Sequence, residues 1–299
     1  MKRRTAAALV TGAFLMMTGC SSPAPPGANL TIVTASYPLQ FLAERIAGGR
    51  ATVVNLTAPG AEPHDLELTA QQLTQLAQAD LVVYQKGFQP AVDEAITAVG
   101  PRATVDVTTG IALRPGPAAP GSTASPSVDP HIWLDPNLMV TMARTVSAAL
   151  IRVTPADEQT FTTSTKELVD DLTTLDGAFR DGLASCRRRE FVTSHEAFGY
   201  LANAYDLIQI PIAGLDPTTE PTAARIKEVQ DLVRRYRVTT IFYETLVSDA
   251  VARTIATDLG LKTDVLDPLE GITDASRGDD YVEVMEANLT ALRTANECT

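Results

Sequence analysis

The chain has 299 residues, a formal net charge of −12 at pH 7 and 45% hydrophobic residues. This length allows two ordinary domains or one large two-lobed domain with a substantial core. Binding to nucleic-acid phosphates needs a basic face, and stacking on bases needs aromatic side chains, which make up only 5% of this chain. The composition therefore argues against a nucleic-acid partner and describes an acidic globular protein.

The N-terminus has the pattern of an export signal. Three basic residues at positions 2–4 precede a short apolar run, and the sequence MTGC ends with Cys20. This pattern resembles a bacterial lipoprotein signal (residues 1–19) that is cleaved before a cysteine that becomes lipidated, and an ordinary secretory signal is the alternative. The apolar run falls short of the ~20 residues that span a membrane. Residues 20–29, rich in proline, then predict a flexible tether.

The first half of the chain predicts strands that alternate with helices. A first strand leads into a helix that ends at Gly48–Gly49, and a stretch rich in proline, glycine and serine at 114–129 predicts a surface loop. The predicted strands cover 31–34, 51–58, 80–85 and 103–107, and the further helices cover 68–79, 90–99 and about 137–151.

Residues 154–185 predict one long linking helix of about 45 Å, with Thr154 as its N-cap. After it, strands are predicted at 190–195, 207–215, 238–244 and 262–268, and helices at 196–206, 222–236, 249–260 and 280–296. Strands that alternate with helices at this spacing favour parallel pairing. The sequence thus predicts an α/β fold of two lobes, 30–153 and 186–299, which flank a cleft and are joined by the long helix.

Two cysteines, Cys186 and Cys298, remain once the predicted signal and Cys20 are set aside. In an oxidising compartment an even pair predicts one disulfide. It would close a loop of about 112 residues, which the chain-entropy model values at about 4–5 kcal/mol. A two-cysteine metal site is the rival interpretation, and the wide separation makes it a poor one.

The chain contains three histidines, and each lies near the end of a predicted strand. They occur as His64 in GAEPHDLE, His131 in DPHIWLDP and His195 in FVTSHEAF. In α/β folds, ligands bind beyond the carboxyl ends of the strands. Neutral imidazole is a common zinc ligand, and three imidazoles with one carboxylate complete a tetrahedral shell. The histidines therefore predict a metal site that folding assembles from both halves of the chain.

The histidine motifs together resemble those of the zinc/manganese solute-binding lipoproteins that feed ATP-driven metal importers. The matching segments are PHDLE (63–67), PHIWLDP (130–136) and TSHEAFGY (193–200). The resemblance covers essentially the whole mature chain. It implies a monomer, lipid-anchored outside the bacterial cell membrane, that captures Zn²⁺ between two lobes without performing chemistry on it. It further implies delivery of the ion to an importer permease with a cytoplasmic ATPase.

The same resemblance points to a fourth ligand. The segment LDPLEG resembles the LxPLE motif of zinc-specific relatives, whose glutamate ligates, and this implies Glu270. Asp267 is the close competitor, and Asp249 is a more distant one. Manganese-type relatives usually carry glutamate at the position of His195, so this histidine favours zinc over manganese. Many zinc-specific relatives have a loop rich in histidine and acids, whereas residues 114–128 contain neither, so a spacer is expected there.

Several neighbours of the motifs have two interpretations. Asp135 and Glu196 are candidates to accept imidazole N–H groups, or else they are a helix cap and a solvated carboxylate. Trp133 is expected to pack beside the site. Nothing in the local pattern requires Glu244 in the cleft, and Arg187–Arg189 are interpreted as a solvated patch.

Two other functions stay open at the level of the sequence. A zinc hydrolase would hold its metal with the three histidines and use Glu270 or Glu196 as general base, with a water completing the metal shell. An adhesin is a third, non-exclusive interpretation, because relatives of this type are sometimes described in that way. A manganese-binding member of the same family is the remaining alternative.

Overall fold

The computed structural model describes residues 30–116 and 128–299. The predicted signal, Cys20 and the tether therefore lie outside the described residues, as does the middle of the predicted proline-rich loop. Among the described helices, none is long and apolar enough to cross a membrane.

The first lobe is built on a parallel four-stranded sheet with the order β2-β1-β3-β4. The central strand β1 is buried on both faces, which explains its run of β-branched residues, and Ile32 pairs with Val53 on one side and Leu81 on the other. The elements are β1 (Leu30–Thr34), α1 (Tyr37–Ala47), β2 (Ala51–Asn55), α2 (Ala70–Gln78), β3 (Leu81–Tyr84), α3 (Pro90–Val99) and β4 (Thr104–Asp106).

The second lobe repeats this topology with a parallel sheet of order β6-β5-β7-β8. In each lobe the first strand of the chain lies between the second and the third, although no close repeat is visible in the sequence. The elements are β5 (Glu190–Thr193), α6 (Gly199–Ala204), β6 (Ile208–Pro211), α7 (Ala223–Tyr236), β7 (Thr240–Tyr243), α8 (Ala250–Leu259), β8 (Lys262–Val265) and α9 (Tyr281–Asn296). The predicted α/β fold with two parallel sheets is confirmed.

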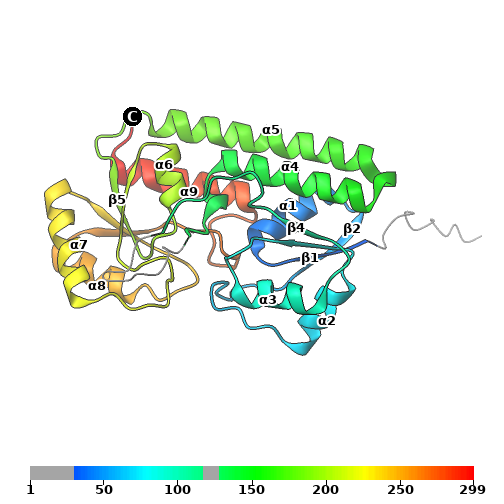
Figure 1. The fold of residues 1–299 in the computed structure, drawn as a ribbon. Coiled ribbons are helices and arrows are strands. Elements are labelled where there is room, and N and C mark those ends of the chain that lie inside the picture. Colours follow the sequence, from blue (N-terminus) through cyan, green and yellow to red (C-terminus); the bar gives the residue numbers. More distant parts are fainter. Residues whose placement is uncertain (1–29, 117–127) are drawn as a thin grey trace, which may run out of the picture.

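A long helix, α5, connects the lobes and runs along both of them (Figure 1). The short 3-10 helix η1 (Ile132–Leu134) leads into α4 (Pro136–Val153), and a second, η2 (Pro155–Asp157), leads into α5 (Glu158–Leu183). Thr154 ends α4 and its side chain makes no cap hydrogen bond, so the prediction that it caps the long helix is wrong. At 1.5 Å per residue, the 26 residues of α5 span about 39 Å.

The helix α5 holds both lobes on one apolar face. Its buried residues recur at the three- and four-residue spacing of a helical stripe, and they pack against α1 and α4 of the first lobe and α9 of the second. One continuous cluster of buried side chains includes β1, α5 and α9. We propose 30–153 and 186–299 as the two lobes, and this shared core limits how far they can hinge apart.

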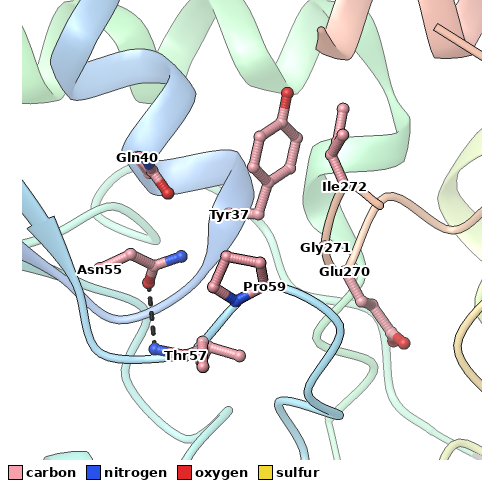
Figure 2. A pocket seen from close by; sticks show the side chains of 9 residues that line it. Tyr37, Gln40, Asn55, Thr57, Pro59, Glu270, Gly271 and Ile272 are labelled. Carbon is pink, nitrogen blue, oxygen red and sulfur yellow. Dashed lines mark hydrogen bonds between the residues drawn. The ribbon is translucent and has the colours of Figure 1, made fainter. Parts of the chain in front are cut away.

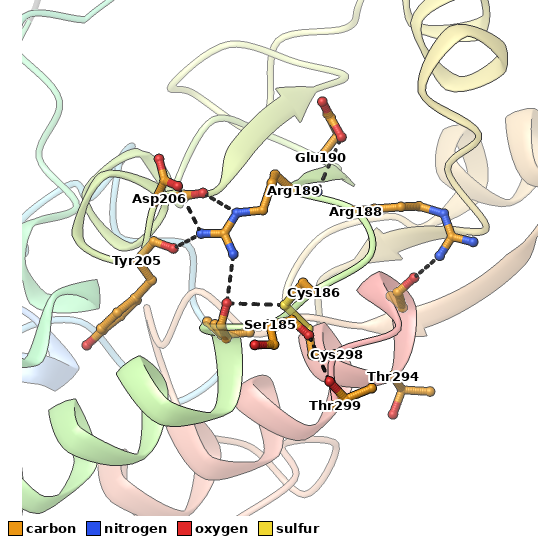
Figure 3. Close-up of a disulfide and its surroundings, with 12 residues drawn as sticks. Ser185, Cys186, Arg188, Arg189, Glu190, Tyr205, Asp206, Thr294, Cys298 and Thr299 are labelled. Carbon is orange, nitrogen blue, oxygen red and sulfur yellow. Dashed lines mark hydrogen bonds and ion pairs between the residues drawn. A yellow bond between two sulfur atoms is a disulfide. The ribbon is translucent and has the colours of Figure 1, made fainter.

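The C-terminus is fastened to the start of the second sheet. A disulfide joins Cys186 and Cys298, and next to it Arg188 and Arg189 donate to backbone carbonyl groups (Figure 3). The side chain of Arg188 is only 12% exposed and also pairs with Glu297. The interpretation of Arg187–Arg189 as a solvated patch is therefore wrong for these two arginines, which brace the segment around the disulfide.

Candidate metal centre

The site is formed where loops from the two lobes meet. His64 lies in the long loop between β2 and α2, and His195 follows β5. His131 does not directly follow a sheet strand, because it is the N-cap residue of η1 after the long connection from β4. Glu270 lies in the loop after β8. Two ligand candidates therefore come from each lobe.

These four side chains point one atom each at a common centre. The ligand atoms of His64, His131, His195 and Glu270 all lie within 4.8 Å of one another. Glu270 Oε1 is 3.0 Å from His64 Nε2, 3.3 Å from His131 Nε2 and 3.6 Å from His195 Nε2. A tetrahedron with bonds of ~2.1 Å has edges of about 3.4 Å, so these separations fit the shell of a zinc-sized ion.

Two buried carboxylates orient the imidazoles. His195 Nδ1 donates to Glu244 Oε1 at 2.7 Å, and His131 Nδ1 donates to Asp129 Oδ1 at 2.9 Å. An ionised carboxylate can only accept, so each Nδ1 carries the proton and each Nε2 is left to face the centre. Both carboxylates also accept the backbone N–H of the same histidine, which fixes the ring relative to its loop.

The predicted acceptors lie elsewhere. Asp135 accepts from the backbone N–H of Asn137 and caps α4, in line with its alternative interpretation. The half-buried carboxylate of Glu196 makes no hydrogen bond to an imidazole within the part of the chain that the structure describes. Sequence reasoning missed Asp129 and gave no reason to include Glu244. The signal for Glu244 was its position at the end of β7, the strand that lies beside β5 in the sheet.

The carboxylates shift the pKa values of the buried groups. Burial alone would lower the pKa of His195, but the charge and hydrogen bond of Glu244 hold it well above its ordinary value. Burial also acts to lower the pKa of His131, and hydrogen bonds to Asp129 and Glu270 raise it above 6.5. Burial alone would raise the pKa of Glu270, but hydrogen bonds from the imidazoles hold it well below its ordinary value. A cation that binds here must therefore displace protons.

The competing carboxylate, Asp267, shapes the loop that carries Glu270. Asp267 Oδ1 accepts from the backbone N–H of Leu269 at 2.8 Å, and its other oxygen accepts from the hydroxyl groups of Thr245 and Ser276. Leu269 has a φ of 58°, a left-handed conformation that costs a non-glycine residue roughly 1–2 kcal/mol. The Asp267 carboxylate thus supports a strained turn and lies outside the group of four ligand atoms.

Further contacts hold this loop from the side of the first lobe. Trp133 Nε1 donates to the Pro268 carbonyl at 2.7 Å, and its ring lies 5.2 Å from that of His131. The prediction that Trp133 packs beside the site is confirmed.

A cavity of ≈180 Å³ borders Glu270 and Tyr37, and Figure 2 shows the Glu270 carboxylate directed away from Tyr37. The more distant competitor, Asp249, pairs with Arg253 on α8.

A glycine in the third histidine motif allows this packing. A Cβ atom on Gly199 would lie 2.7 Å from Asp129 Oδ2, which is too close for contact. The next residue, Tyr200, donates its hydroxyl to the Asp129 carbonyl at 3.1 Å. The FGY portion of the motif therefore positions the carboxylate that orients His131.

A second acid lies beside the centre. Glu62 Oε1 accepts the backbone N–H of His64 at 3.0 Å, while its Oε2 and the Oε2 of Glu270 are buried and accept no hydrogen bond from any described residue. Burial and the nearby charge of Glu270 raise the pKa of Glu62 to about 8. Sequence reasoning did not single out this residue.

Comparison with known proteins places the chain among metal-uptake components. Residues 32–295 match the family described as "Zinc-uptake complex component A periplasmic". The chain is 32% identical over 295 residues to the zinc-binding lipoprotein AdcA of Streptococcus pneumoniae strain R6, and this alignment covers 95% of the chain and 59% of AdcA. It is 30% identical over 304 residues to the high-affinity zinc uptake system protein ZnuA of Bacillus subtilis, covering 95% of each.

Solved structures of similar fold also belong to metal-binding proteins. The Zn(II)-bound ZnuA-like domain of S. pneumoniae AdcA is 33% identical, with a TM-score of 0.77 over 90% of this chain and 99% of that domain. The laminin-binding protein Lmb of Streptococcus agalactiae, described as having adhesin and metal-transporting activity, is 27% identical, with a TM-score of 0.81 over 89% of this chain and 99% of Lmb. The chain spans little more than half of the pneumococcal AdcA relative that contains this domain. By the extent of its match, the chain belongs to the zinc-uptake complex component A family.

Proposed function

We propose that the chain captures Zn²⁺ outside the cytoplasm and delivers it to the permease of an ATP-driven importer. The observation that carries the proposal is the convergence of three imidazole Nε2 atoms and one carboxylate oxygen within 4.8 Å, at His64, His131, His195 and Glu270. Three of these side chains are at most 1% exposed, so an ion held there is removed from bulk water. The zinc-binding relatives named above support the choice of metal.

The composition of the shell favours zinc over manganese. Imidazole suits Zn²⁺, whereas Mn²⁺ prefers shells that are rich in oxygen. The carboxylate partners of His131 and His195 raise the basicity of these ligands, as the residues around tightly held zinc ions do. Zn²⁺ is thus the ion that this chemistry fits best.

The same shell disfavours the hydrolase alternative. A catalytic zinc site has three protein ligands and keeps one position for water, whereas four protein ligands close a tetrahedral shell. Glu270, the candidate general base, lies 3.0–3.6 Å from the imidazole nitrogens and so occupies the position that the water would need. Glu196, the other candidate, makes no hydrogen bond to an imidazole among the described residues.

The proposed function also implies a cellular location and partners for the chain. A lipid on Cys20 would anchor the chain to the outer face of the bacterial membrane through the tether at 20–29, and a monomer would pass the ion to the permease and its cytoplasmic ATPase. Adhesion remains a secondary prediction, supported by the resemblance to Lmb, and binding to immobilised laminin would test it.

The deciding experiment is metal analysis of the purified protein together with competition titration of Zn²⁺ against Mn²⁺. We expect one equivalent of Zn²⁺ and a preference for Zn²⁺ of several orders of magnitude. Tighter binding of Mn²⁺ would overturn the assignment of the metal. Turnover of an ester or peptide that depends on added Zn²⁺ would overturn the transport function in favour of the hydrolase.

A further inference from the structure

A pocket of ≈500 Å³ opens in the second lobe beside the candidate metal centre. Its lining comes mostly from the loops that follow β6 (between 212 and 221) and β7 (between 246 and 252), and it also includes Ser194, the neighbour of His195. None of the four ligand candidates lines it. Among the described residues that do, the charged ones are Glu62 and Glu220, and both are acidic.

Glu62 is the residue that connects this pocket to the metal centre. It lines the pocket, but its Oε2 is buried, with no hydrogen-bond donor among the described residues. Its other oxygen accepts the backbone N–H of His64, so the carboxylate is attached to the loop of a ligand candidate. Glu270, a second ligand candidate, is close enough for its charge to act on Glu62.

We propose that the pocket is the route by which Zn²⁺ enters and leaves the centre, and that Glu62 binds the ion transiently on the way. This inference rests on the proposed function. A hydrated cation that enters a pocket with only acidic charges is attracted inward. The buried oxygen of Glu62 can replace one water ligand before the ion reaches the imidazoles, because carboxylate oxygen is an accepted zinc ligand.

The geometry explains why Glu62 acts in transfer rather than in the resting shell. Glu62 already accepts a hydrogen bond through Oε1, and it is not among the four side chains whose ligand atoms converge. Those four complete a tetrahedral shell, so a fifth permanent ligand is not needed. A group that binds only between the pocket and the shell lowers the barrier in both directions, and it leaves the equilibrium affinity almost unchanged.

The test compares Glu62→Gln with Glu67→Gln in the metal-free mature chain. Glutamine at position 62 keeps the shape, and its amide oxygen can still accept the His64 N–H, so that an amide nitrogen, which is not a zinc ligand, takes the place of the buried carboxylate oxygen. Glu67 is an exposed acid of the same loop that does not line the pocket, so its variant makes the same substitution away from the proposed route. The fluorescence of Trp133, whose ring lies 5.2 Å from that of His131, reports Zn²⁺ binding by stopped flow, and extraction by EDTA gives the dissociation rate.

For Glu62→Gln we expect association and dissociation of Zn²⁺ to slow together by about 10-fold or more, with Kd unchanged within about 3-fold. Glu62→Asp, which retains a carboxylate ligand, should recover most of the rate, and Glu67→Gln should behave as the unmodified chain. An unchanged association rate in Glu62→Gln would overturn the proposal. Faster dissociation with a weaker Kd would overturn it too, because Glu62 would then be a permanent ligand. Failure of the unmodified chain to bind Zn²⁺ would instead refute the proposed function.

Discussion

Replacement of Glu244 by glutamine is expected to weaken Zn²⁺ binding although this residue is not among the four ligand candidates. Its carboxylate is only 2% exposed and accepts from His195 Nδ1 at 2.7 Å. A hydrogen bond to a charged group contributes about 1.5–3 kcal/mol, and 1.36 kcal/mol corresponds to a factor of ten. The amide retains an acceptor oxygen but loses the charge that increases the basicity of His195. We therefore expect Kd for Zn²⁺ to rise by about 10- to 100-fold.

The assay is a competition titration against a chromophoric zinc chelator at fixed pH. Glu196→Gln is the matched control, because Glu196 follows His195 directly in the chain and is half-buried, but does not orient an imidazole. We expect the control to keep the unmodified Kd within about 2-fold, since it removes no hydrogen bond to a ligand. The reasoning is refuted if Glu244→Gln binds as tightly as the unmodified chain, or if Glu196→Gln causes the larger loss.

Three further outcomes are expected. Glu270→Ala should weaken Zn²⁺ binding far more than the loss of a surface carboxylate does, whereas Asp267→Ala should chiefly lower the thermal midpoint of unfolding. Titration calorimetry measures the affinity and scanning calorimetry measures the midpoint; a loss of affinity confined to Asp267→Ala would show that Glu270 is not the fourth ligand. The double variant Cys186→Ser and Cys298→Ser removes a disulfide that joins residues 112 positions apart, and it should lower the free energy of unfolding by about 4–5 kcal/mol in urea titrations. An unchanged urea midpoint would contradict this. Zn²⁺ affinity should fall as pH falls through the raised pKa values of His131 and His195, with protons released on binding, and a flat profile from pH 6 to 8 would contradict the shifts.

The pH dependence of the metal-free fold has the opposite sign for the two kinds of group. Because the folded-state pKa values of His131 and His195 are raised above 6.5, they contribute stability that is fully present below that pH. This contribution disappears as the pH rises through the folded-state values. Glu270, whose folded-state pKa is lowered, contributes stability above 4.5 that is lost as the pH falls through its folded-state value.

Local pattern was sufficient for the helices and strands because their signals are local. The run of β-branched residues from Thr31 to Thr34 and the Gly48–Gly49 pair mark a strand and the end of a helix by backbone chemistry alone. The sequence predicts the start of α5 too early, because Thr154 and Pro155 form a good N-terminal signal that belongs to the short helix η2 instead. Such a choice depends on how the end of α4 packs, and no local signal records it.

The sequence by itself is enough to predict a metal site and a disulfide. The metal site follows from three widely spaced histidines in recognisable motifs, and the disulfide follows from an even cysteine pair. The partners of these groups were decided by tertiary structure. Glu244 reaches His195 because β5 and β7 are neighbours in a parallel sheet, and Asp129 is held against His131 because Gly199 leaves room for it. The convergence of Glu270, rather than Asp267, with the imidazoles accompanies a left-handed turn at Leu269 that Asp267 supports. Sequence records which ligands are available, whereas only the fold fixes the direction of each lone pair, because that direction depends on hydrogen bonds between residues far apart in the chain.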